Sequence, residues 1–233
     1  MSTGTRWYRA KDGTQQFYIT DSALEELAEV ELHRAGLMPK IAGPVEIETF
    51  IERHLEANLD YGADLEPGVL GLTELRVGQK PSVRIARDLT DAALEVDQYS
   101  GTLGRWRATL AHEAAHVLLH GFLFELNLGQ ETMFDDVPVE EARMLRCLKR
   151  DVVFARGGRD PREVQANKGM AALLMPRTLF GATARTMAQT MDEEQLTVDI
   201  ARKFEVSRQA GRIRLQTLGF LEPDGTYVVG ILG

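Results

Sequence analysis

The sequence predicts an α+β fold that is mainly helical, and three observations lead to this prediction. An almost wholly apolar helix carries the pentapeptide His-Glu-Ala-Ala-His at residues 112–116. Ahead of it, glycine and proline separate short apolar runs between residues 61 and 97, which is typical of a small β-sheet. Beyond residue 177 the chain is amphipathic with helical spacing. We therefore expect a small sheet that precedes a buried helix, followed by a C-terminal helical segment.

The first twenty residues predict a small hairpin or an ordered arm. Aromatic pairs at residues 7–8 and 17–18 flank Lys-Asp-Gly at residues 11–13, a combination that favours a turn. A first helix is expected from Asp21 to Ala35, because Ser22 and Glu25 match a capping box.

A second helix is expected from about Glu46 to Asn58, after Pro44. Gly36 separates it from the first helix. His33 and His54 lie on these two helices without a second metal-binding side chain at helical spacing. Each is interpreted as a surface or half-buried histidine.

The following stretch predicts a sheet of two to four strands that ends near residues 94–96. The apolar runs at residues 69–72 and 83–86 are its clearest strands, and the second is interpreted as alternating apolar with charged residues, as a half-buried strand does. Ser100 or Thr102 then begins the buried helix, and Gly121 is expected to end it.

Residues 122–160 change from an acidic first half to a basic second half. Pro138 precedes a helix that we expect over residues 139–154. The whole stretch is interpreted as an insertion or a lid, and a simply solvated excursion explains it equally well.

A buried helix is predicted between Asp160, as its N-cap, and Pro176, which ends it, with Pro161 at its first position. Glu163 is therefore a carboxylate in the first turn of an apolar helix. The small residues of this helix would let a second helix approach closely; they are Ala166, Gly169, Ala171 and Ala172.

Three tail helices are expected over residues 177–191, 193–204 and 207–218. Gly219 ends the third, and residues 227–229 could add a last strand. Residues 201–207 followed by a basic helix are also typical of a helix-turn-helix.

Composition restricts the class of protein. The 233 residues carry a net charge of −8, which argues against wrapping nucleic acid with the whole surface. No apolar run reaches the roughly 18 residues of a membrane span, and the N-terminus has no apolar signal core. A single cysteine, Cys147, fits a reducing compartment, so we expect a cytoplasmic protein.

The pentapeptide at residues 112–116 has a direct chemical interpretation. Histidines four apart on a helix differ by about 40° in rotation, so His112 and His116 can bind one metal ion. Glu113 can then act as general base on a metal-bound water without being a ligand. The alternative is a core helix that carries two histidines by chance, although buried histidines and a buried glutamate without partners would be costly.

A catalytic zinc usually has three protein ligands, so one more is needed. Glu163 is the best candidate, with Asn167 one turn later to hydrogen-bond the site. Cys147 could bind as a thiolate. His120 is interpreted as structural, because its rotation drifts about 80° from His112. The remaining carboxylates lie in a stretch that looks solvated; they are Asp135, Asp136, Glu140 and Glu141.

Three motifs in order resemble the ImmA/IrrE family of metallopeptidases. They are His-Glu-Ala-Ala-His within residues 109–120, Glu-x-x-Ala-Asn at the start of residues 163–176, and residues 201–219, which end in Leu-Gly. The resemblance covers roughly residues 44–221. Ala-Ala replaces the family's more usual Leu-Gly pair inside the first motif, and the stretch between the first two motifs is longer than in compact members.

The resemblance implies a thermolysin-like zincin core, with His112, His116 and Glu163 as metal ligands and Glu113 as the base. It implies a metallopeptidase domain at residues 41–221, preceded by an arm and helix (1–40) and followed by a tail (222–233). The metal would be Zn²⁺, with Mn²⁺ also accepted by such ligands.

Several family members act on helix-turn-helix repressors, so a repressor is the implied partner. Nucleic acid is not expected as a partner, because this tail normally packs against the peptidase core in the family. The oxyanion-stabilising residue is open, with Tyr99 and His120 as candidates. The alternative function is a non-catalytic metal-containing regulator, either a toxin–antitoxin-type partner or a DNA-binding protein.

Overall fold

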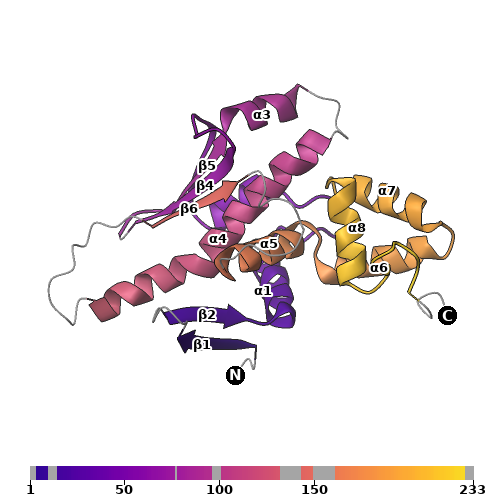
Figure 1. Ribbon diagram of the computed structural model, residues 1–233, viewed down its shortest axis with the longest axis horizontal. Coiled ribbons are helices and arrows are strands. Elements are labelled where there is room, and N and C mark those ends of the chain that lie inside the picture. The colour runs from indigo at the N-terminus through magenta and orange to yellow at the C-terminus, as the bar shows by residue number, and fades with distance from the viewer. Residues whose placement is uncertain are drawn as a thin grey trace.

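The computed structural model confirms an α+β fold in which helices predominate (Figure 1). It describes residues 4–9, 15–76, 78–95, 101–131, 143–148 and 161–228. The long helix α4 (Gly101–Glu131) runs through the middle of the molecule. A small sheet lies on one side of it, and the tail helices gather at the far end of α5 (Pro161–Leu174).

The N-terminal hairpin is confirmed. Strand β1 (Thr5–Arg9) pairs antiparallel with β2 (Gln15–Ile19), while the predicted turn falls outside the described residues. Helix α1 (Asp21–Arg34) follows directly. Its N-cap is Thr20, whose side chain accepts a hydrogen bond from the backbone of Ala23, so the predicted capping box at Ser22 is wrong. Thr20 takes the role because it is the last residue with extended backbone after the strand.

The second predicted helix is present but shorter than expected. It consists of one turn, α2 (Ile47–Thr49), and a widened π-helical segment, η1 (Phe50–His54). Asn58 does not belong to it, because that residue already begins a strand. His54 is half-buried beside Glu31, and His33 is exposed, as predicted for both histidines.

The main sheet has four strands in the order β3-β5-β4-β6. Strand β3 (Asn58–Ala63) is parallel to β5 (Ser82–Ala86). Strand β4 (Val69–Leu75) pairs antiparallel with β5 on one side and with β6 (Arg143–Leu148) on the other. β4 is therefore an inner strand, held by a strand that precedes α4 and by one that follows it.

Two expectations about this region are wrong. The predicted strand near residues 94–96 is not present at its described residues, because α3 (Arg87–Leu94) occupies this part of the chain and buries Leu89 and Ala93, four residues apart; residue 96 lies outside the described part. Residues 139–154 do not form one helix, since 143–148 are β6. Pairing with β4, far away in the sequence, decides this conformation, and local pattern does not reveal it.

Helix α4 is longer than predicted. Gly121 does not end it, and ten more residues follow in helical conformation to Glu131. Gly121 is absent from the described glycines with positive φ, so it lacks the left-handed backbone of a helix C-terminus. The predicted close approach of α5 is confirmed: a Cβ atom on Gly169 would lie 2.8 Å from the Cβ atom of Ala115 on α4.

The tail forms the three predicted helices. They are α6 (Arg177–Ala188), α7 (Glu193–Lys203) and α8 (Arg208–Thr217), the last capped by Ser207. Gly219 follows with a φ of +74°. Of the last strand predicted at residues 227–229, the described part forms an isolated bridge between Leu221 and Tyr227, and residue 229 lies outside the described residues. None of the helices in the described ranges combines the length and the apolar character that crossing a membrane needs.

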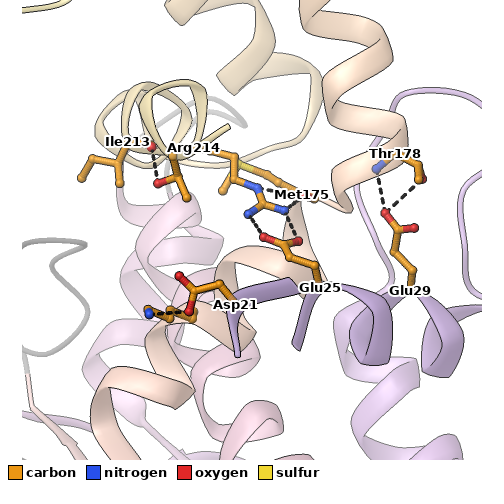
Figure 2. Close-up of polar contacts among 9 residues, drawn as sticks. Asp21, Glu25, Glu29, Met175, Thr178, Ile213 and Arg214 are labelled. Atoms are coloured by element: carbon orange, nitrogen blue, oxygen red, sulfur yellow. Dashed lines mark hydrogen bonds and ion pairs between the residues drawn. The ribbon is translucent and has the colours of Figure 1, made fainter. Parts of the chain in front are cut away.

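Helix α1 is joined to the rest of the domain by three carboxylates spaced four residues apart, Asp21, Glu25 and Glu29 (Figure 2). Asp21 accepts a hydrogen bond from Lys168 of α5 at 2.6 Å. Glu29 accepts two from Thr178, one from its backbone nitrogen and one from its hydroxyl. Since Thr178 lies in the first turn of α6, Glu29 satisfies a backbone N–H group that this turn leaves without a helical partner.

The middle carboxylate, Glu25, binds the buried guanidinium of Arg214 from α8 through both of its oxygens (Figure 2). Arg214 also donates two hydrogen bonds to the backbone carbonyl of Met175, just beyond α5. Arg214 is only 2% exposed, so its charge depends on these partners. The contact fixes α1, α8 and the end of α5 to one another.

Candidate metal centre

Helices α4 and α5 bring the three predicted ligands together. His112 and His116 lie one turn apart on α4, and Glu163 lies in the first turn of α5. The two Nε2 atoms are 3.0 Å apart, and the Glu163 oxygens lie 3.1 Å from the Nε2 atom of His112 and 3.3 Å from that of His116. Ligand atoms bound tetrahedrally to zinc at ~2.0 Å are ~3.3 Å from one another. These distances involve both oxygens of Glu163, and the ligand atoms of the three residues all lie within 4.8 Å of one another, close enough to bind one metal ion.

The environment of this cluster also fits a cation. Both imidazoles are fully buried, and the side chain of Glu163 is 15% exposed. Burial opposes the charge of Glu163, but hydrogen bonds from both histidines hold the pKa of its carboxyl well below the usual range. Burial lowers the pKa of His116, which favours a neutral ring. Burial acts in the same direction at His112, but the hydrogen bond with Glu163 and the nearby carboxylates outweigh it, so the pKa of that ring is raised. A carboxylate and two imidazoles are donors that zinc prefers.

Glu113 lies beside the cluster, and only one of its two carboxylate oxygens has a hydrogen-bond partner within the part of the chain that the structure describes. Its Oε2 atom accepts a hydrogen bond of 2.5 Å from the hydroxyl of Thr73 on β4. Its Oε1 atom is buried and has no hydrogen-bond partner among the described residues. Burial raises the pKa of Glu113 to about 7, although His112 and the Thr73 hydrogen bond act in the opposite direction. A carboxylate with a pKa near neutrality can both accept and return a proton.

Gly71 of β4 makes room for this carboxylate. A Cβ atom there would lie 2.5 Å from Oε1 of Glu113 and 2.8 Å from a methyl group of Thr109. Real Cβ atoms do not approach this closely, so any larger residue at this position would force β4, Thr109 or the Glu113 carboxylate to shift. Oε1 of Glu113 has no hydrogen-bond partner in the described ranges, and Gly71 leaves space next to it. This combination is typical of a site that needs an ionisable side chain and not of an apolar core contact.

A second set of polar side chains holds the histidine rings. Asn167, the predicted neighbour, is 3.2 Å from Nδ1 of His112. His120 was interpreted as structural, and the structure places its ring directly behind that of His116. Burial lowers the pKa of His120 to about 3, so its ring is neutral at physiological pH. Gln165 of α5 lies on the far side of His120.

Sequence reasoning missed Thr73, Gly71 and Gln165. Thr73 and Gly71 reach the site through the packing of β4 against α4, and Gln165 through the packing of α5 against α4. The isolated glycine in an apolar strand was a usable signal, because such a glycine often marks a close approach of the backbone. Thr73 and Gln165 carry no comparable signal.

Several earlier candidates cannot be placed. The side chain of Cys147 lies outside the described part of the structure, although its backbone in β6 pairs with Gly71. The other candidates outside the described residues are Tyr99, Asp135, Asp136, Glu140 and Glu141. Within the described residues, His112, His116 and Glu163 form the cluster that could hold a metal ion.

Comparison with known families supports the resemblance seen in the sequence. Residues 154–216 match the peptidase M78 family, described as the IrrE N-terminal-like domain. The match contains Glu163, α5 and most of the tail helices, while His112 and His116 precede it. None of the curated proteins compared with the chain matches it.

Proposed function

We propose that this chain, part of which matches the M78 peptidases, is a metal-dependent endopeptidase that cuts a specific regulatory protein. One observation carries the proposal: three converging metal-binding atoms lie beside Glu113, a buried glutamate with one oxygen held and the other unpartnered. A cluster that bound metal only for structure would have no use for this unpartnered carboxylate. A hydrolase needs it as a general base.

His112, His116 and Glu163 would hold the metal, with Zn²⁺ as the first choice and Mn²⁺ also compatible with these donors. When bound, the ion would polarise the scissile carbonyl and favour ionisation of the attacking water. Asn167 would keep the ring of His112 turned toward the ion.

In this proposal Glu113 acts first as the general base and then as the general acid. Its Oε1 atom accepts a proton from the attacking water and later delivers it to the nitrogen of the leaving amine. Thr73 holds Oε2, so the carboxylate has a fixed rotation and only one oxygen is available for the transfer. The position of Glu113, one residue after His112 and pointing toward β4, keeps it close to the ligands without joining them.

The substrate proposed is a helix-turn-helix repressor. This rests on the resemblance to ImmA/IrrE peptidases, several of which act on such repressors. A repressor is cut only where its chain can enter the site in an extended form, so we expect cleavage in an exposed segment and not inside a helix.

A DNA-binding role for the tail is less well supported. Helices α7 and α8 have the order of a helix-turn-helix, but Arg214 points inward to Glu25, and Arg208 pairs with Glu194. At Gly104 of α4, a Cβ atom would lie 2.5 Å from the backbone nitrogen of Ser207. The turn between the two helices is thus packed on α4. An operator fragment should not shift at about 100 mM salt, on the order of physiological ionic strength.

The test compares cells that express the wild-type protein with cells that express Glu113→Gln. We expect one regulatory protein to be shortened only by the wild type, while purified Glu113→Gln retains stoichiometric metal. Glu95→Gln, at an exposed residue after α3, is the matched control and should cut normally. Cleavage of a verified substrate by Glu113→Gln at the wild-type rate would remove Glu113 as the base.

A further inference from the structure

A chain of hydrogen bonds leads away from His116 on the side opposite the metal position. The Nδ1 atom of His116 is 3.1 Å from Nδ1 of His120, one turn further along α4. The Nε2 atom of His120 is 3.4 Å from Oε1 of Gln165. Both His120 and Gln165 are buried, at 4% and 7% exposure. Gln165 lies two residues after Glu163 on α5.

The donor-to-acceptor direction of these hydrogen bonds decides whether His116 can bind a metal. A neutral imidazole carries one N–H group, and a metal can bind only the nitrogen without the proton. For Nε2 of His116 to bind, the proton must be on Nδ1 and must be donated to Nδ1 of His120. His120 then carries its own proton on Nε2, where the Oε1 atom of Gln165 accepts it.

The reverse direction would block the site. If Gln165 presented its amide N–H₂ group, His120 would accept at Nε2 and donate from Nδ1 to Nδ1 of His116. The proton of His116 would then occupy Nε2, the atom that faces Glu163 and His112. The side-chain oxygen of Gln165 thus selects the form of His116 that can bind a metal.

We propose that His120 and Gln165 are positioning residues that fix the tautomer and the ring orientation of His116 for metal binding. The inference rests on the proposed function, because it assumes that His116 is a ligand. Neither residue touches the metal. Gln165 and Glu163 both belong to α5. This helix therefore supplies one ligand, Glu163, and also the last residue of the hydrogen-bond series that orients another ligand, His116. His112 has a shorter arrangement of the same kind, with Asn167 alone.

The first test measures zinc affinity by competition with a chromophoric chelator, which does not depend on catalysis. His120→Leu removes the acceptor at similar bulk and should weaken zinc binding by about 10- to 100-fold. His120→Gln keeps an acceptor and should restore most of the affinity. The control is His54→Leu, because His54 is a helical histidine whose partner is Glu31 and not a residue of the cluster. It should bind zinc as the wild type does.

A second variant and a spectroscopic measurement cover the case in which His120→Leu does not fold. Gln165→Met should also weaken zinc binding, because His120 would lose its acceptor. In the zinc-loaded wild type, long-range ¹H–¹⁵N correlation should show His120 protonated on Nε2 and not on Nδ1.

The outcomes separate the two proposals. Wild-type affinity in folded His120→Leu, or a proton on Nδ1 of His120, would overturn this inference alone. A wild-type protein that binds no zinc would overturn the proposed function and the inference with it. Loss of affinity in His120→Leu that His120→Gln does not reverse would show that the missing acceptor is not the cause of the loss, and would also overturn the inference.

Discussion

Thr73 donates its hydroxyl hydrogen to Oε2 of Glu113 across 2.5 Å, and this bond joins an inner strand of the sheet to the metal helix. The two residues are 40 positions apart in the sequence. Because β4 is paired on both sides, Thr73 cannot move without disturbing β5 or β6. The sheet therefore acts as the support against which the proposed base is oriented.

Replacing Thr73 by valine should slow peptide cleavage by about 10- to 100-fold, which corresponds to losing one hydrogen bond to a charged group. Valine has the same shape, so metal content and fold should be retained. Thr73→Ser keeps the hydroxyl and should remain close to wild type. The comparison needs kcat for both variants on one substrate. An unchanged kcat in Thr73→Val would show that the bond does not orient Glu113.

Glu163→Ala should lose most of the bound metal while circular dichroism remains largely helical. A first-turn carboxylate on so buried a helix is costly unless a cation meets it, and the helix N-terminus favours its ionised form. In a metal-loaded crystal, Glu163 should lie within about 2.0–2.2 Å of zinc. Metal analysis decides the matter. Full zinc occupancy in Glu163→Ala, or a metal held by Cys147, would remove Glu163 as a ligand.

Gly71→Ala should lower both activity and stability. The added Cβ atom would meet Oε1 of Glu113 and Thr109, so β4 or the carboxylate must shift, at a cost of about 1–3 kcal/mol. Gly181→Ala is the control, because it lies inside α6 with nothing within 4 Å of the new Cβ atom. It should stabilise the protein by about 0.5–1 kcal/mol. Denaturant titration measures both changes, and equal effects would contradict the close approach at Gly71.

The metal-free wild-type protein should lose stability relative to metal-free Glu113→Gln as pH rises from about 5 to 8. The pKa of Glu113 is raised from 4.5 to about 7 in the fold, so the folded state holds a proton that the unfolded state has released. That stabilisation is fully present below the unfolded pKa and is lost as pH rises through about 7. The metal-free Glu113→Gln variant has no such group. Between about pH 5 and 8 its free energy of unfolding should rise relative to that of the wild type by at most about 3 kcal/mol. Parallel pH profiles for the two proteins would contradict the raised pKa.

Glu25→Ala should destabilise the fold by about 3–5 kcal/mol, because it leaves the buried guanidinium of Arg214 without its carboxylate. Asp199→Ala breaks an ion pair whose arginine, Arg202, is largely exposed. This control should cost no more than about 1 kcal/mol. Thermal or denaturant unfolding compares the two variants. Similar small losses in both would show that Arg214 finds other partners.

Much of the cluster could be predicted from local pattern. The rotation between residues four apart on a helix placed His112 and His116 on one side of α4. An acidic residue in the first turn of an apolar helix marked Glu163, and helical spacing added Asn167. These predictions needed only local geometry and the cost of burying charge.

The parts that could not be predicted depend on contacts between distant segments. The strand conformation of residues 143–148 is set by pairing with β4. Strand β4 also carries Thr73, which contacts Glu113. Helix α4 continues past Gly121 because a glycine is tolerated inside a helix at a cost of about 1 kcal/mol, which surrounding contacts can exceed. Hydrogen-bond partners such as Gln165 become visible only when both helices are in place.

The separation of the ligands along the chain has a thermodynamic consequence. His112 and Glu163 lie 51 residues apart, so one ion bound by both would act as a cross-link that closes a long loop. Ligand at 100 times its dissociation constant adds about 2.7 kcal/mol to the free energy of unfolding. The entropic cost of closing a flexible loop rises by only about 0.6 kcal/mol for each doubling of its length. Residues can therefore be inserted between the two helices with little loss of metal affinity.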